Sequence, residues 1–283
     1  MNRTAEEMLV TPSAVSASLA RLEKELGVKL FDRVGRNIRL NQYGKILSKY
    51  TDQVFTALDS AKTELREAQN PGKGSITVAI TNPNLWNKAL HAFYTAYPEI
   101  FISLTAFDTG SNQLYSGHGD PLVQHADFYI AAPGATIHTD GSLESEILFY
   151  SQVLLAVSPK HRFARRKSID LAEARDEWFV NSPYKTSFRT FCDNLCQQAG
   201  FTPKSRIECD YMLRPRMLIN ENMVCLATSL GRQSGLYEGT VMIPIEKPPC
   251  SRPQAIYWRA KGYQSRANQV FKEFLLNYCR KMM

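Results

Sequence analysis

The sequence predicts an α/β protein with a small N-terminal head, one long helix and a larger body. In the head, two short helical stretches precede a pair of short extended segments. Residues 43–69 then place apolar side chains at every third or fourth position, which is typical of one continuous helix. From Ser75 onwards, apolar extended runs alternate with helical periodicity, and this alternation is typical of α/β folds.

The second helical stretch of the head, Thr11–Gly27, has the clearest helix signals. Thr11 is a good N-cap, because its hydroxyl accepts a hydrogen bond from one of the first unpaired N–H groups. Pro12 suits the first helical position, and Gly27 favours the left-handed residue that ends a helix. The predicted inward face holds Val15, Leu19, Leu22 and Leu26, and the predicted outward face holds Ser13, Ser16, Ala17, Ala20 and Lys24.

A shorter helix is predicted upstream, at Thr4–Leu9, with Ala5, Met8 and Leu9 pointing inward and Val10 in the following turn. Two short helices joined by a tight turn, the second with a flat polar face, describe a helix-turn-helix. An ordinary amphipathic helix pair inside a core has the same periodicity, so periodicity alone leaves both interpretations open.

The residue types favour the helix-turn-helix. The DNA-binding domain of LysR-type transcriptional regulators closely resembles the run Val10–Ser16 followed by Leu19, Leu22-Glu23, Glu25–Gly27, Leu30–Arg33 and Arg36. The resemblance implies a winged helix-turn-helix with double-stranded DNA as its partner. It makes Thr11–Gly27 the recognition helix and Phe31–Leu40 the wing.

The candidate DNA contacts follow from this resemblance. A recognition helix presents its outward face to base edges, and the wing lies beside the phosphates. We expect Thr11 and Ser13 to anchor phosphates, Ser16 and Ala17 to face bases, and Arg33 and Arg36 to hold the flanking backbone. Ala17 offers only an apolar contact, for example to a thymine methyl group. The alternative for the wing is a solvated basic hairpin.

LysR-type heads normally begin with a further helix, whereas this sequence reaches the helix at Thr4–Leu9 almost at once. Without that further helix, Ala5, Met8, Val15 and Leu19 would be less covered than in a complete head. We expect the true start to lie upstream, because the remaining motif keeps its apolar spacing. The alternative is a degraded head that binds DNA weakly.

The predicted long helix, Tyr43–Gln69, carries a narrow apolar stripe flanked by charged residues, which suits pairing with a second copy of the chain. Asn70–Gly74 predicts a hinge. By resemblance the helix is a dimerising linker, so a homodimer or homotetramer is expected. The stripe consists of Leu47, Tyr50, Val54, Leu58, Ala61, Leu65 and Ala68.

The body alternates predicted strands and helices, which indicates an α/β domain with mostly parallel sheets. The expected strands are 76–80, 100–107, 128–132, 152–158, 206–209, 223–227, 241–245 and 256–259. The expected helices are 85–97, a start at 111–115, 187–199, 212–220 and 265–279.

The body also resembles the effector-binding domain of the LysR-type family, a two-lobed α/β fold of periplasmic-binding-protein type. The matching landmarks are Phe149–Ala164 and Ala199–Pro203. The implied organisation is a DNA-binding domain at 1–44, a linker helix and hinge at 45–74, and an effector-binding domain at 75–283. Within that domain, lobe I would comprise 75–151 and 256–283, and lobe II 152–255.

A small-molecule effector is expected between the lobes, where loops after the strands and helix N-termini converge. The family usually has a glycine-rich turn where this chain has Asn220–Met223 and a Leu-Asp-Leu strand where it has Ala126–Tyr129, and the loop 116–124 is longer. Effector identity therefore cannot be inferred. By resemblance the candidates are Thr81, Asn82, Asn84, Thr109, Gly110, Ser111, Asn112, Ser182, Tyr184 and Thr186, each with a solvated loop residue as the alternative.

Charge places DNA binding in the head. The net charge is +7, yet residues 1–49 carry nine Lys and Arg against five Asp and Glu, while residues 71–156 carry two against seven. The sequence has no run of 18 apolar residues and no signal segment, so a cytoplasmic protein without membrane contact is expected. The 6 cysteines lack metal-ligand pairing and are expected to be reduced thiols.

No catalytic set emerges, so neither an enzyme nor a cofactor is expected. His118 and His125 lack further ligands at metal spacing, and no metal site is expected. Cys192 and Cys196 lie one helical turn apart and should pack in a core, with redox sensing as the alternative. Two rival functions fit the sequence less well, because residues 1–49 and the lack of a signal segment argue against the first and the missing catalytic set argues against the second. One is a periplasmic-type small-molecule sensor with little or no DNA binding, and the other is a hydrolase or transferase on an α/β scaffold.

Overall fold

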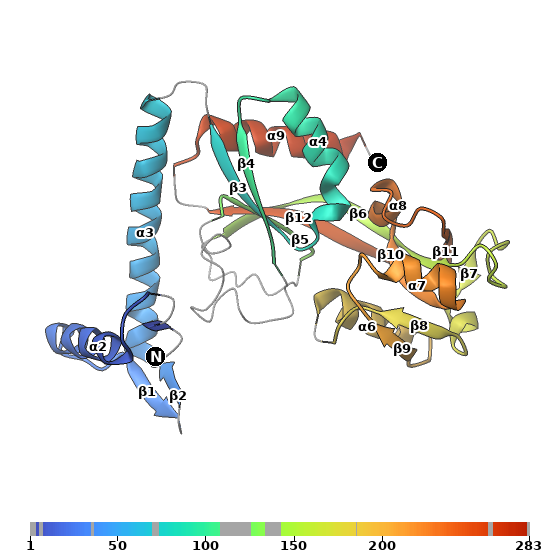
Figure 1. Cartoon of the computed structure of the whole chain (residues 1–283), viewed down its shortest axis with the longest axis horizontal. Coiled ribbons are helices and arrows are strands. Elements are labelled where there is room, and N and C mark those ends of the chain that lie inside the picture. Colours follow the sequence, from blue (N-terminus) through green and yellow to red (C-terminus); the bar gives the residue numbers. More distant parts are fainter. Residues whose placement is uncertain are drawn as a thin grey trace. The chain divides into compact units, whose positions relative to one another are not determined.

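The computed structural model describes residues 4–5, 8–34, 37–69, 74–107, 126–133, 143–184, 186–259 and 263–281 (Figure 1). The chain forms two compact units, one of residues 1–69 with 262–264 and one of residues 70–261 with 265–283. The first unit contains the head and the long helix, and the second contains the α/β body. Within the described residues, no helix is both long and apolar enough to cross a membrane.

The first unit contains α2 (Pro12–Leu26), a hairpin of β1 (Phe31–Val34) and β2 (Asn37–Leu40), and α3 (Gln42–Gln69). The expected caps of α2 are present, since the Thr11 hydroxyl accepts a hydrogen bond from the Ala14 N–H at 3.3 Å and Gly27 has φ +70°. The two strands pair antiparallel, with Phe31 opposite Leu40. Upstream of α2, the Met8 N–H bonds the Thr4 carbonyl, as in a helical turn.

The predicted inward positions of Leu9, Leu22 and Leu26 are wrong, because these side chains are exposed. Met8 is exposed too, which agrees with the expectation that it is less covered than in a complete head. Leu9 adopts a left-handed conformation, with φ +53°, at the end of the first helical turn and is 94% exposed. The buried position of α2 is Glu23, which faces the turn at Leu30. Val15 and Leu19 are partly buried, and Ala5 is fully buried rather than less covered as expected.

A close backbone approach joins the hairpin to α3. The Asn41 side chain accepts a hydrogen bond from the Gly44 N–H at 2.9 Å and donates to the Lys29 carbonyl at 2.9 Å. A Cβ added to Gly44 would lie 2.2 Å from the Leu30 carbonyl oxygen and 2.6 Å from Leu40 Cδ2. Only glycine fits there without displacing backbone, so Gly44 sets the distance between helix and hairpin.

The body is built on one mixed sheet with the strand order β4-β3-β5-β12-β6-β10-β8-β9, to which β11 adds through β6 and β7 through β11. The strands at the lobe I end are β3 (Ser75–Ile80), β4 (Phe101–Ala106), β5 (Phe128–Ala131) and β12 (Ser251–Arg259). The others are β6 (Leu143–Val157), β7 (Ile169–Asp170), β8 (Trp178–Asn181), β9 (Lys204–Glu208), β10 (Val224–Thr228) and β11 (Val241–Lys247).

Strand direction departs from the expectation of mostly parallel sheets. Neighbours β4, β3 and β5 are parallel, as are β10, β8 and β9. The pairs made by the long strand β6 with β12, β10 and β11 are all antiparallel. Residues 143–152 of β6 pair with β12, and residues 153–157 pair with β10 and β11, so this one strand joins the two lobes. The expected strand at 152–158 is only its second half.

Helices cover the sheet in each lobe. They are η1 (Pro83–Trp86), α4 (Asn87–Ala96), η3 (Leu171–Ala174), α6 (Ser187–Gln198), α7 (Arg214–Glu221), α8 (Ser229–Gln233) and α9 (Arg266–Arg280). Helix α7 begins two residues later than expected, because Asp210 Oδ1 accepts the N–H groups of Met212 and Leu213 in a turn. The expected helix start at 111–115 lies outside the described residues.

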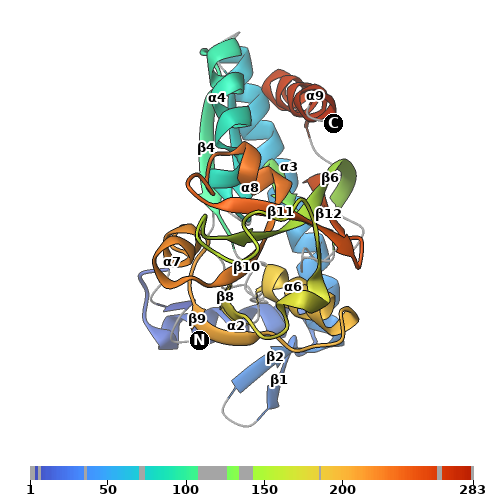
Figure 2. The ribbon, with the colours of Figure 1, turned by 90° about the vertical axis from the view of Figure 1, so that its right-hand side faces the viewer.

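Each lobe has its own hydrophobic core. In lobe I, α4 and α9 lie together against the sheet, and the Phe93 and Phe271 ring centroids are 5.0 Å apart (Figures 1 and 2). In lobe II, the core includes Phe179, Leu195 and Val224. The predicted fold class, a two-lobed α/β body with an N-terminal winged helix-turn-helix and a long helix, is confirmed.

Candidate functional site

The outward face of α2 is exposed at the positions expected to meet DNA. Ser13, Ser16 and Ala17 are all exposed. Thr11 is also exposed, but its hydroxyl already caps α2 and hydrogen-bonds the Ser13 hydroxyl at 2.9 Å. Arg33 is exposed on β1. The sixth candidate DNA contact, Arg36, lies outside the described residues.

Glu23 holds α2 against the hairpin, a role that the sequence analysis missed. Its carboxylate accepts hydrogen bonds from Lys29 Nζ at 2.6 Å and from the Leu30 N–H at 2.9 Å. The hydrogen bond from Lys29, together with that from Leu30, holds the pKa of Glu23 below its ordinary value. The sequence does carry a signal for this role, because Glu23 is an acidic residue on the helix face that is otherwise predicted to be apolar.

The stripe on α3 is exposed within the first unit. Tyr50, Val54, Leu58 and Leu65 are each more than half exposed, and so are their apolar neighbours Ile46 and Phe55. An exposed apolar stripe along most of this 28-residue helix is unusual on a monomer, and such surfaces mark protein–protein contacts.

The lobe I candidates follow the carboxyl end of β3. The Thr81 backbone N–H and the Thr81 hydroxyl both donate a hydrogen bond to the Ile130 carbonyl oxygen, at 3.1 and 3.5 Å. Asn82 Oδ1 is buried without a hydrogen-bond donor among the described residues. Asn84 Nδ2 donates to Tyr211 Oη at 3.0 Å, and Tyr211 belongs to lobe II. Thr109, Gly110, Ser111 and Asn112 lie outside the described residues.

The lobe II candidates surround the N-terminus of α6. Thr186 caps this helix by accepting the Arg189 N–H at 3.3 Å. Ser182, at the end of β8, is buried, and its carbonyl accepts a hydrogen bond from Arg189 Nη1 at 3.2 Å. Tyr184 is 71% exposed. The Asn84–Tyr211 hydrogen bond links these two lobes, and Tyr211 is a contact that the sequence analysis missed.

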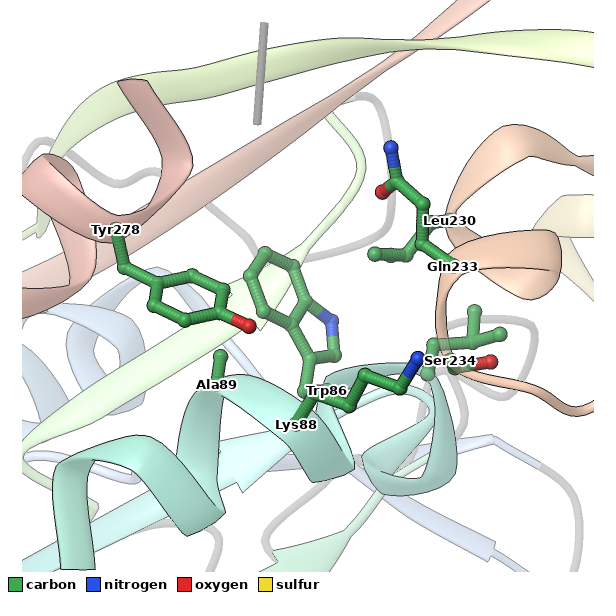
Figure 3. Close-up of a pocket in the computed structure, with 8 residues that line it drawn as sticks. Trp86, Lys88, Ala89, Leu230, Gln233, Ser234 and Tyr278 are labelled. Atoms are coloured by element: carbon green, nitrogen blue, oxygen red, sulfur yellow. The ribbon is translucent and has the colours of Figure 1, made fainter. Parts of the chain in front are cut away.

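A separate pocket of about 330 Å³ lies between η1, α4, α8 and α9 (Figure 3). Trp86, Leu230 and Tyr278 give it a largely apolar wall, and the Lys88 ammonium lies at its edge beside Ser234 (Figure 3). None of the candidate effector residues lines it.

The cysteines of α6 lie in the lobe II core, as expected. Cys192 and Cys196 are both buried, and burial raises the pKa of each thiol, that of Cys196 to about 12. Such thiols are protonated at neutral pH and poorly reactive. Among the described residues, no group of three or more His, Cys, Asp or Glu side chains could hold a metal ion, and His118 and His125 lie outside them.

Comparisons with known proteins agree with the architecture. The family model for the bacterial regulatory helix-turn-helix protein, lysR family, matches residues 1–45, and the model for the LysR substrate binding domain matches residues 69–280. The transcriptional dual regulator GltC of Bacillus subtilis is 27% identical over 274 residues, which cover 95% of this chain and 89% of GltC.

Solved structures show the same fold. Full-length CbnR complexed with its target DNA is 18% identical, with a TM-score of 0.57 over 98% of this chain and 93% of CbnR. The effector-binding domain of BenM with its effector benzoate is also 18% identical, with a TM-score of 0.59 over 74% of this chain and 94% of that domain.

Proposed function

Because the chain belongs to the LysR family of bacterial transcriptional regulators, we propose that α2 is its recognition helix and lies in the major groove of its target DNA. One observation carries the proposal. The small residues Ser13, Ser16 and Ala17 form an exposed face of α2, and Arg33 of the hairpin is exposed as well. Ser16 and Ala17 face base edges, Ser13 and the helix cap at Thr11 bond phosphates, and Arg33 and Arg36 hold the flanking backbone.

Two copies pair through the exposed stripe of α3. Pairing buries Tyr50, Val54, Leu58 and Leu65, which a single copy leaves in water. It also sets two recognition helices at a fixed spacing, so that they reach successive major grooves. The pairing supports a homodimer or a homotetramer on DNA, and a chromosomal target places the working protein in the cytoplasm.

A small-molecule effector binds between the lobes and controls how the dimer meets DNA. Its lobe I contacts are Thr81, Asn82 and Asn84 with the 109–112 segment, and its lobe II contacts are Ser182, Tyr184 and Thr186. The unpaired Asn82 Oδ1 supports this, because a buried acceptor without a donor is stabilised by a ligand that supplies one. The BenM domain has benzoate as its effector, which supports an effector of about the size of benzoate here. The alternative is a small-molecule sensor with little or no DNA binding.

Replacing Ser16 by Glu tests the recognition helix. The carboxylate would meet phosphates and base edges at close range, so specific affinity should fall by more than about 10-fold. Ser18→Glu is the matched control, because Ser18 is also exposed on α2 but lies on the opposite face. Fluorescence anisotropy on one DNA fragment at one salt concentration measures both. If the Ser16→Glu isotherm superposes on that of the parent, α2 does not read DNA.

A further inference from the structure

Two buried arginines, Arg214 of α7 and Arg252 of β12, have no carboxylate partner among the described residues. Arg214, the first residue of α7, is 6% exposed, and Arg252 of β12 is 9% exposed. In the part of the chain that the structure describes, neither forms a salt bridge, and Arg214 Nε has no hydrogen-bond acceptor at all. A guanidinium is always charged in proteins, so two positive charges are buried here without a paired negative charge.

Both guanidinium groups lie at the start of α6. The Phe188 ring is 5.2 Å from the Cζ atom of Arg214 and 5.2 Å from that of Arg252. Arg252 also donates to the Ser187 hydroxyl at 3.0 Å and to the Ser187 carbonyl at 3.4 Å. These cation–π contacts and neutral acceptors recover only part of the cost of removing two charges from water.

Arg189, on the same helix, is a largely buried arginine that is paired with two carboxylates. Its Nε atom bonds both oxygens of Asp193, at 2.9 and 2.8 Å, and its Nη1 bonds Glu208 at 2.6 Å. The side chain of Arg189 is slightly more exposed than Arg214, yet it has two carboxylates where Arg214 has none. Arg214 and Arg252 are thus as deeply buried as Arg189 but lack the carboxylates that Arg189 has among the described residues.

We propose that Arg214 and Arg252 form an oxyanion subsite of the effector cleft, which takes a carboxylate or phosphate group of the ligand. The inference rests on the proposed effector site and specifies its ligand chemistry. Ser187 directly follows the candidate contact Thr186, and Tyr211, three residues before Arg214, bonds Asn84 of lobe I. The N-terminus of the 12-residue α6 adds its positive dipole end to the two guanidinium charges.

Thermal unfolding of the full chain tests the subsite with acetate and inorganic phosphate as minimal probes, against chloride at equal ionic strength. A saturable rise in Tm is expected with at least one probe, by about 3–6 °C when the anion is tenfold above its dissociation constant. Acetate alone indicates a carboxylate ligand and phosphate alone a phosphate ester, while a response to both leaves the site open to either group. If neither probe shifts the parent, the proposal is overturned.

Methionine substitutions separate binding from structure. The double variant Arg214→Met, Arg252→Met should lose the anion response and, in chloride, keep or exceed the Tm of the parent, because two uncompensated charges are gone. Arg189→Met, the matched control, should lower Tm but retain the response, since it leaves Asp193 and Glu208 unpaired. An anion response that persists in the double variant, or a loss of Tm equal to that of Arg189→Met, would contradict the subsite.

DNA binding of the same double variant, without added anion, keeps this inference distinct from the proposed function. The variant should bind the target fragment as the parent does, because the two arginines lie in the body. A parent that fails to bind DNA, yet responds to anions through Arg214 and Arg252, would refute the DNA-binding proposal and leave the subsite standing.

Discussion

At the scale of single residues, Glu23 and Gly44 determine how α2 and α3 are held against the hairpin. Glu23 receives hydrogen bonds from Lys29 and from the Leu30 N–H, and Gly44 lets α3 approach the same Leu30 backbone. Leu30 is itself buried. The helix, the hairpin and the long helix of the first unit therefore meet at one turn.

The ion pair of Glu23 predicts a pH dependence. Because its pKa is lowered in the folded protein, the carboxylate stabilises the first unit above the ordinary value of 4.5, and this contribution is lost as the pH falls through the folded pKa. Glu23→Gln should thus be less stable than the parent at neutral pH, with a difference that vanishes below the folded pKa. Urea unfolding of both proteins across this range measures it. Glu25→Gln, at an exposed position of the same helix, is the control.

Gly44→Ala should destabilise the first unit by about 1–3 kcal/mol, because its methyl group would enter the space of the Leu30 carbonyl oxygen. Chemical denaturation followed by circular dichroism measures the loss. Gln42→Ala, an exposed position at the start of the same helix, is the control and should change stability little. Equal stability of the Gly44→Ala variant and the parent would show that the close approach does not constrain the helix.

At the scale of elements, local residue types predict where a helix begins and ends, whereas tertiary packing determines which of its faces is buried. Thr11, Pro12 and Gly27 act on their own neighbours, so the bounds of α2 followed from the sequence. Which side is covered depends on what packs there, and so Leu22 and Leu26 were assigned wrongly. Candidate site residues at helix caps, such as Thr186, were likewise accessible to sequence reasoning, whereas Tyr211 and Arg214 act through partners distant in sequence.

The exposed stripe of α3 predicts the effect of a charge placed in it. Leu58→Asp should raise the dissociation constant of the dimer by more than about 100-fold, because an unpaired carboxylate would be buried between two helices. Val54→Asp should act similarly. Analytical ultracentrifugation gives the constant, with Gln53→Asp, exposed on the flank of the stripe, as the control. Unchanged association of the Leu58→Asp variant would remove α3 from the interface.

At the scale of the whole molecule, alternation of strands and helices predicted the α/β class but not the course of the chain between lobes. Parallel pairing within each lobe follows from strands joined by helices. The antiparallel pairing of β6 with β12 joins residues 143–152 to residues 251–259, about a hundred residues further along the chain. A local sequence pattern cannot predict a pairing between segments so far apart. That same strand continues into lobe II, where it pairs with β10 and β11.

Residues 1–49 are basic and residues 71–156 are acidic, so we expect the N-terminal end of the chain to bind DNA. Binding to phosphates releases counterions from the DNA, so the affinity for DNA should fall steeply as the salt concentration rises.

The role of this chain that most needs a direct test is sequence-specific binding to DNA. Its most direct test is a nuclease footprint of the full chain on the intergenic DNA upstream of its own coding region. We predict protection of two half-sites separated by one or more turns of the double helix. An unrelated fragment of equal length should show no such protection at the same protein concentrations. Uniform coverage of both fragments at the same concentrations would contradict the claim.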